Sequence, residues 1–354
     1  MKDTNAEKSR LQWIDLFRGI AVIWMIETHT ANTFLRPELL SADWFKWLNY
    51  FNGLVAPAFL FIAGVLQGRR QKPGVGGQRG GAGLQPLVSR LSRIGKLLLL
   101  GYALHFSIPS DGKWAVVFSH IDILQCMAVA MLVGLGIRPF GRGLAGAAAL
   151  VVVLAAPLMS RVAPESVPVL VAGYLNRLNG SLFPLFPWAG FFFAGWFCQE
   201  FKIRECLIGA GVCWGVVWVQ RFLPAVYPPY DYYLAGPGFF LERLGWMLIG
   251  VGCCQVWDFM DPMDGYGRNI SAISRAGRSS LAIYVIHLQL INLLVWSAKM
   301  LGIPLKTGVP GMVAIFLGIA ALSLTLAGLL GLLRGAPPYR WLRECRASAS
   351  IPPP

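Results

Sequence analysis

Apolar stretches recur along the whole chain of 354 residues, and many are long enough to cross a bilayer. A helix needs about 20 predominantly apolar residues to cross the hydrocarbon core. The stretches lie at 11–32, 48–68, 87–106, 118–137, 143–158, 183–199, 204–222, 239–257, 279–300 and 310–333. The composition agrees, because 56% of the residues are hydrophobic, 14% are charged and the mean hydropathy is +0.57. The sequence therefore predicts an all-α, polytopic membrane helix bundle of about ten transmembrane helices.

Basic residues predict the orientation of these spans, because Lys and Arg near helix ends are retained on the cytoplasmic side. With a cytoplasmic N-terminus, 21 of the 31 Lys and Arg residues fall on the cytoplasmic side and nine on the other. We therefore expect both termini in the cytoplasm and a multi-pass protein of the plasma (inner) membrane. The net charge of +14 follows mostly from this asymmetry and favours contact with anionic membrane lipid. No motif for binding DNA or RNA accompanies it, so nucleic acid is not an expected partner.

The chain reads as a single transmembrane domain over residues 1–354. Residues 69–86 include the glycine-rich segment PGVGGQRGGAG and predict a flexible basic cytoplasmic loop. Residues 335–354 predict a short cytoplasmic tail.

The first apolar stretch carries ionisable residues inside it, which is costly at membrane depth unless they face a bundle interior or a watery cavity. Asp15, Arg18 and His29 fall within about 60° of one another on a helical wheel, whereas Glu27 faces elsewhere. Arg18 and His29 are about 16 Å apart along the axis, so they can line one path at two depths. The alternative is structural: Asp15 and Arg18 form an ion pair near the interface and His29 caps the helix.

Histidine is the side chain best suited to proton transfer near neutral pH, and all four histidines lie in or beside predicted spans. The predicted topology puts His29, His105 and His120 on the outer side and His287 nearer the middle of its span. A membrane histidine often only satisfies a hydrogen bond between helices, and His105 fits that interpretation. His29 and His287 are better placed for function.

Several segments together resemble one family. They are RLQWIDLFRGIAVIWMIETH at the start, NGLVAPAFLFIAG at 52–64, HIDILQ at 120–125, FPLFPWAGFFFAGW at 183–196 and RSSLAIYVIH ending at His287. They resemble the heparan-alpha-glucosaminide N-acetyltransferase family and its bacterial relatives. The spacing of Arg18 and His29 is also similar to that in membrane acyltransferases that O-acylate sugars, and both families fall in one transmembrane acyltransferase group.

The resemblance implies an acetyl-CoA-dependent transmembrane N- or O-acyltransferase. Acetyl-CoA would be a co-substrate on the cytoplasmic side, with no tightly bound cofactor and no metal, and a sugar or glycan would be the acceptor on the outer face. The chain enters its first span almost directly, without the luminal domain of eukaryotic members, so a different acceptor is expected.

Acetyl transfer needs a base for the acceptor's proton and a donor for the developing oxyanion, in a site that excludes water. His29 is the expected base, because it lies on the outer side where a sugar would enter. Asp15 and Arg18 lie deeper and either hold each other or line the CoA path. His287, with Tyr284 one turn before it, is a second proton-transfer residue or an oxyanion donor. His120 with Asp122 is the next candidate for the base.

Coenzyme A requires cations for its phosphates, and the candidates are Arg90, Arg93 and Lys96 in the third span with Arg275 and Arg278 before the ninth. The same residues also simply satisfy the positive-inside rule. A transporter or flippase for a small or lipid-linked substrate is the main alternative function, and a haem-binding protein is a weaker one. The sequence leaves open the acceptor, N- versus O-acylation, the acyl chain length, direct versus covalent transfer, and whether the chain forms a homo-oligomer.

Overall fold

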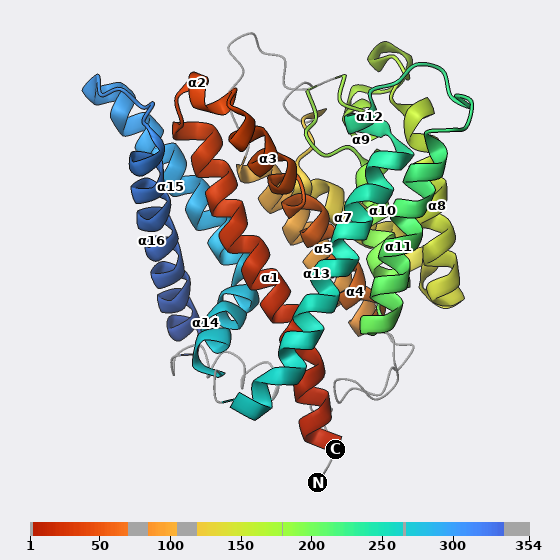
Figure 1. Cartoon of the computed structure of the whole chain (residues 1–354), viewed down its shortest axis with the longest axis horizontal. Helices are drawn as coiled ribbons and strands as arrows, with labels where there is room; N and C mark the ends of the chain where they lie inside the picture. The colour runs from red at the N-terminus through yellow and green to blue at the C-terminus, as the bar shows by residue number, and fades with distance from the viewer. Residues whose placement is uncertain (1–2, 70–83, 105–118, 179, 265–266, 336–354) are drawn as a thin grey trace, which may run out of the picture. The chain divides into compact units, whose positions relative to one another are not determined.

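The computed structural model describes residues 3–69, 84–104, 119–178, 180–264 and 267–335 (Figure 1). Within these ranges every regular element is a helix, apart from one isolated bridge between Leu35 and Thr307. The chain divides into two compact units, one formed by residues 1–52 with 261–354 and the other by residues 53–260. The loop predicted at 69–86 and the tail predicted at 335–354 lie almost entirely outside the described residues.

The first unit joins the two ends of the chain around helix α1. Its helices are α1 (Asp3–Phe34), α2 (Pro37–Leu40), α3 (Asp43–Asn52), α14 (Gly267–Arg278), α15 (Ser280–Leu301) and α16 (Val309–Gly335). Helices α14, α15 and α16 all pack against α1. At the far end of α1, the Thr307 backbone nitrogen donates to the Phe34 carbonyl at 2.7 Å, and Lys306 Nζ donates to the Thr33 carbonyl at 3.0 Å. The link between α15 and α16 therefore crosses the C-terminal end of α1.

The second unit is built around helix α10. Its helices are α4 (Val55–Arg69), α5 (Leu84–Leu104), α7 (Ile123–Ile137), α8 (Gly141–Met159), α9 (Val169–Leu175), α10 (Leu185–Phe197), α11 (Ile203–Gln220), α12 (Tyr232–Ala235) and most of α13 (Pro237–Asp264). Helices α4, α7 and α8 pack around α10. Two glycines let α4 and α10 touch through their backbones, because a Cβ atom on Gly64 would collide with the Phe192 carbonyl and one on Gly195 with the Phe61 carbonyl.

Each of the ten predicted spans overlaps a helix, but not every one of these helices is long and apolar enough to cross a membrane. Among the described residues, six helical stretches are long and apolar enough to span a membrane: Asp43–Arg69, Ile123–Met159, Ile203–Gln220, Pro237–Met260, Ser280–Leu301 and Val309–Leu332. The second of these contains two predicted spans, which separate at a 3₁₀ turn over Arg138–Phe140 and at Gly141, whose φ of 76° favours glycine. Helix α10 has only 13 residues, too few to cross the hydrocarbon core alone. The count of ten spans and the cytoplasmic position of the termini stay predictions.

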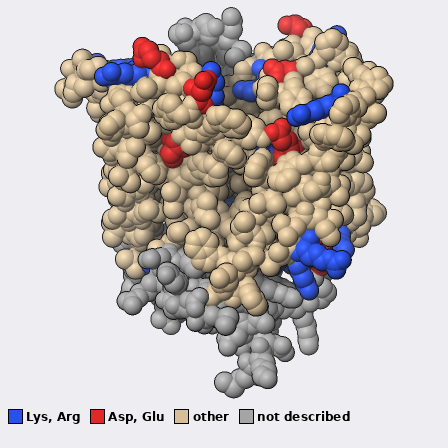
Figure 2. All heavy atoms as spheres, in the orientation of Figure 1, with Lys and Arg blue, Asp and Glu red and all other residues tan. Residues whose placement is uncertain are grey.

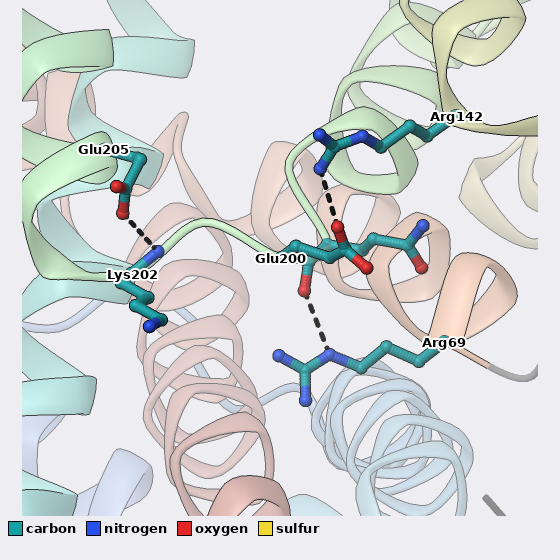
Figure 3. Close-up of polar contacts among 6 residues, drawn as sticks. Arg69, Arg142, Glu200, Lys202 and Glu205 are labelled. Carbon is teal, nitrogen blue, oxygen red and sulfur yellow. Dashed lines mark hydrogen bonds and ion pairs between the residues drawn. The ribbon is translucent and has the colours of Figure 1, made fainter. Parts of the chain in front are cut away.

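Basic residues gather at one end of the second unit. Figure 2 shows a cluster of Lys and Arg side chains at the lower ends of α8 and α11. Figure 3 shows two contacts at this end of the unit: Arg142 Nη1 lies 2.8 Å from Glu200 Oε2, and Nε of Arg69, the last residue of α4, donates to the Gln199 carbonyl at 3.1 Å. In the predicted topology, the spans that correspond to α8 and α11 both begin on the cytoplasmic side. In the structure the beginnings of these two helices also lie at the same end of the unit.

Candidate active site

The polar stripe of α1 faces α14 and α15, within the first unit. Near the middle of α1, Gly19 lies against the Ile273 carbonyl and Gly277 lies against the Asp15 carbonyl, so closely that neither glycine has room for a Cβ atom. These two contacts hold α14 directly on α1. As a result, side chains on the same face of α1 reach residues that follow them in the sequence by more than 250 positions.

The first layer of this site, called the inner layer below, is a network of charged and polar side chains between the middle of α1, the end of α14 and the start of α15. Arg18 Nη2 donates to Ser280 Oγ at 2.6 Å, and Arg18 Nη1 lies 3.9 Å from Asp15 Oδ1. The other carboxylate oxygen of Asp15 lies 3.5 Å from Arg278 Nη1. Arg18 and Asp15 are mostly buried, with side-chain exposures of 24% and 21%, whereas Arg278 is 56% exposed. Asp15 therefore holds two guanidinium groups, one of them tied to α15.

The second layer is a pair of imidazoles further along α1. Nδ1 of His29 lies 3.0 Å from Nε2 of His287, and the two rings meet edge to edge, with centroids 5.1 Å apart and an interplanar angle of 27°. Nδ1 of His287 lies 2.9 Å from the Ile283 carbonyl oxygen in its own helix. The Tyr284 ring meets His287 edge-on at 5.7 Å. His287 is fully buried, and His29 is half-buried.

The contacts in the two layers give the relative direction of helices α1 and α15. Arg18 meets Ser280 in the inner layer, and His29 meets His287 in the second layer, so both helices proceed in the same direction. The predicted topology also gives the first and ninth spans one direction. His29 is not at a helix end, because α1 continues to Phe34, so the interpretation of His29 as a cap is wrong.

Glu27 lies on another face of α1, as the helical wheel predicts. On this face Trp24 Nε1 donates to Oδ1 of the buried Asn52 at 2.7 Å. Glu27 Oε2 and Asn52 Nδ2 are both buried on this face, and the Glu27 carboxylate lies against the Asn52 side chain. The carboxylate is therefore separate from the two layers that contain Arg18 and His29.

His120 and Asp122 belong to the second unit. They lie in the extended segment before α7, where the Asp122 backbone nitrogen donates to Gln125 Oε1 at 3.2 Å and the Ile121 nitrogen donates to Ser181 Oγ at 2.9 Å. Asp122 and Gln125 are buried, and His120 is half-buried. The HIDILQ motif thus starts a helix in this unit. His105, the remaining histidine, lies outside the described residues.

The five cations expected to hold coenzyme A are not gathered within one unit. Arg90, Arg93 and Lys96 lie on α5, with Arg90 half-buried and the other two exposed. Arg275 and Arg278 lie near the end of α14 and are exposed, and Arg278 contacts Asp15. Of this set, the structure connects only Arg278 to the polar stripe of α1.

Sequence reasoning missed two groups of this site, Ser280 and the Ile283 carbonyl. Ser280 lies two helical turns before His287, so the two share a face of α15, as Arg18 and His29 share a face of α1. The parallel direction of the two spans, together with these matched faces, was the available signal. A backbone carbonyl leaves no signal in the sequence.

A family model described as heparan-alpha-glucosaminide N-acetyltransferase, catalytic, matches residues 10–214, more than half of the chain. The chain belongs to this family. A comparison with curated proteins finds no match. Membership identifies a multi-pass membrane protein of an acetyltransferase family. The matched stretch contains Asp15, Arg18 and His29 and ends before α15. The family match therefore includes His29 but not His287, which the structure places beside it.

Proposed function

We propose that this chain takes an acetyl group from acetyl-CoA on the cytoplasmic side of the plasma (inner) membrane and transfers it to an amine or hydroxyl of a sugar on the outer face. His29 is the base of this reaction. The observation that carries the proposal is the contact between His29 and His287 within a chain of this acetyltransferase family.

In the proposed step, the acceptor nitrogen or oxygen attacks the carbonyl carbon of the thioester while His29 takes its proton. The bond between carbon and sulfur then breaks, and the CoA thiolate leaves and takes up a proton. The half-buried position of His29, beside the fully buried His287, favours a site where little water competes for the thioester.

The inner layer supports a role for Arg18 on the donor side. Arg18 lies about three helical turns nearer the predicted cytoplasmic end than His29, and Asp15 and Ser280 hold its guanidinium group in place. A fixed guanidinium can pair with a phosphate or orient the thioester end of the donor. A transporter would also carry such residues, but the family match favours transfer chemistry.

The test is acetyl transfer by the full chain in membrane vesicles, with labelled acetyl-CoA and a panel of glycans. His29→Ala should lower the single-turnover rate by roughly 100- to 10,000-fold, the range for removal of a general base, while acetyl-CoA affinity is retained. Asn32→Ala is the matched control, since Asn32 lies on the same helix, is exposed and donates to the Thr28 carbonyl within that helix.

Three outcomes would contradict the proposal. A wild-type rate in His29→Ala would show that His29 is not the base and would make His120 with Asp122 the next candidate. Label retained on the protein without an acceptor would indicate a covalent route. Movement of a glycan across the vesicle membrane without acetylation would indicate a transporter.

The proposed orientation has its own test in the basic loop before α5. A cysteine introduced at Gly77, which lies outside the described residues, should react with an impermeant thiol reagent only after cells are opened. Strong labelling in intact cells would reverse the orientation and place His29 on the cytoplasmic side.

A further inference from the structure

The hydrogen bonds of His287 fix which of its nitrogens carries the proton. Nδ1 of His287 faces the Ile283 carbonyl oxygen at 2.9 Å. A carbonyl oxygen can only accept a hydrogen bond, so Nδ1 must donate. In the neutral imidazole the other nitrogen, Nε2, then carries the lone pair.

That lone pair decides the tautomer of His29. Nε2 of His287 lies 3.0 Å from Nδ1 of His29. Since Nε2 of His287 accepts, Nδ1 of His29 must donate and therefore carries its ring proton. The basic lone pair of a neutral His29 is then on Nε2.

We propose that His287 is a positioning residue that fixes His29 in the Nδ1–H tautomer, so that Nε2 of His29 is the atom that accepts the acceptor's proton. The inference rests on the proposed function for its meaning in catalysis, but the tautomer itself does not. The hydrogen bonds are then donated in one direction, from His29 to His287 and from His287 to the Ile283 carbonyl oxygen.

Burial separates the roles of the two histidines. His287 has an exposed fraction of 0%, packed under Tyr284 and against His29. A side chain with no accessible surface does not reach a substrate oxygen, which argues against the role of oxyanion donor. His29 is half-buried and is the member of the pair that a substrate can approach.

The arrangement also suits the charge that develops during transfer. When Nε2 of His29 takes a proton, the ring becomes cationic and its Nδ1–H donates a stronger, charge-assisted hydrogen bond to His287. The neutral His287 thus stabilises the imidazolium and holds its ring plane. A buried carboxylate orients a catalytic histidine by the same logic, and loss of the correct tautomer is then very costly to the rate.

The first experiment reads the tautomer without any activity. The full chain, labelled with ¹⁵N-histidine, is measured by NMR in nanodiscs at a pH where the pair is neutral, and His29→Ala identifies the His29 signals. We expect a protonated Nδ1 and an unprotonated Nε2 on His29. A His29 protonated on Nε2 would overturn the proposal, whether or not the chain transfers acetyl groups.

The second experiment tests the link to catalysis through two variants. His287→Leu removes the acceptor for His29 Nδ1–H and should lower kcat by roughly 10- to 100-fold with little change in the KM for acetyl-CoA. His287→Gln supplies an amide oxygen at similar reach and should restore much of that loss. Equal rates in wild type and His287→Leu, or equal losses in both variants per folded protein, would contradict the positioning role.

The two experiments separate the failures. If the wild type transfers no acetyl group but the tautomer is as expected, the proposed function fails and the pairing stands. If transfer depends on His29 but its proton is on Nε2, the proposed function stands and the positioning role fails.

Discussion

Helices α1 and α10 each lie at the centre of their own unit and both make close contacts between glycines and backbone, but of the two only α1 adds ionisable groups to its contacts. Helix α1 carries Asp15, Arg18, Glu27 and His29 and meets α14 and α15 through charged and imidazole groups. Helix α10, LFPWAGFFFAGWF, contains no ionisable residue. Its contacts are glycines against backbone and aromatic rings, such as Phe191 on Phe240 at 4.3 Å.

The difference distinguishes contacts that stabilise the helix bundle from ionisable groups that are suited to chemistry. Between helices in lipid, close packing of small residues and rings supplies stability at little cost. Ionisable groups at the same depth cost free energy, so their concentration on α1 indicates function. Unit 2 has its own exception in α13, where Arg243 is buried and lies 4.9 Å from the Phe239 ring, so the contrast holds for the two central helices rather than for every helix.

The largest effect on stability is expected in the contact between α4 and α10. In Gly195→Ala the new methyl group would overlap the Phe61 carbonyl, and the helices must move apart. We expect a loss of at least about 1–3 kcal/mol, measured as thermal unfolding in detergent. Gly211→Ala is the control, because a Cβ atom there meets nothing within 4 Å, and it should be neutral or stabilising by up to about 1 kcal/mol. Equal effects of the two changes would show that close packing does not hold α10.

Local periodicity was enough to predict the stripe on α1 and the all-helical fold. The 100° step per residue places Asp15, Arg18 and His29 on one face, and the structure shows that face against α14 and α15. Apolar length similarly located a helix in each predicted span. These features depend on residues a few positions apart.

Contacts between distant segments could not be predicted in the same way. His29 and His287 are separated by 258 positions, and each span alone shows only an isolated histidine. The span predicted at 183–199 does contain a helix, but α10 is shorter than the apolar run, because Pro184 precedes it and Phe186 in its first turn is non-helical. The division of the chain into two units depends on packing between the first and last helices, which composition does not reveal.

An intermediate effect is expected in the inner layer of the first unit. Arg18→Ala removes the donor to Ser280 and one of the two cations beside Asp15. A hydrogen bond to a charged group contributes about 1.5–3 kcal/mol, and because Arg18 is partly exposed we expect a stability loss at the lower end of that range, together with weaker acetyl-CoA binding. Ser280→Ala should cost less, because Asp15 still holds the guanidinium group.

The double variant Arg18→Ala with Ser280→Ala checks this interpretation. If the two side chains act together, the double change should cost less than the sum of the single changes, by about 0.5–3 kcal/mol. Strictly additive losses, with acetyl-CoA affinity unchanged in all three variants, would reduce the inner layer to a structural ion pair and leave the imidazole pair as the only chemistry of α1.

The smallest effect is expected at the basic end of the second unit. Arg142 and Glu200 contact at 2.8 Å, but their side chains are 50% and 38% exposed. Exposed ion pairs contribute about 0–1 kcal/mol, because water and salt screen them and two long side chains must be ordered. Glu200→Gln should therefore shift thermal unfolding only slightly at low salt and not at all at about 1 M salt, where charges are screened within a few Å. A loss as large as that of Gly195→Ala would mean that charge, rather than close packing around α10, holds this unit together.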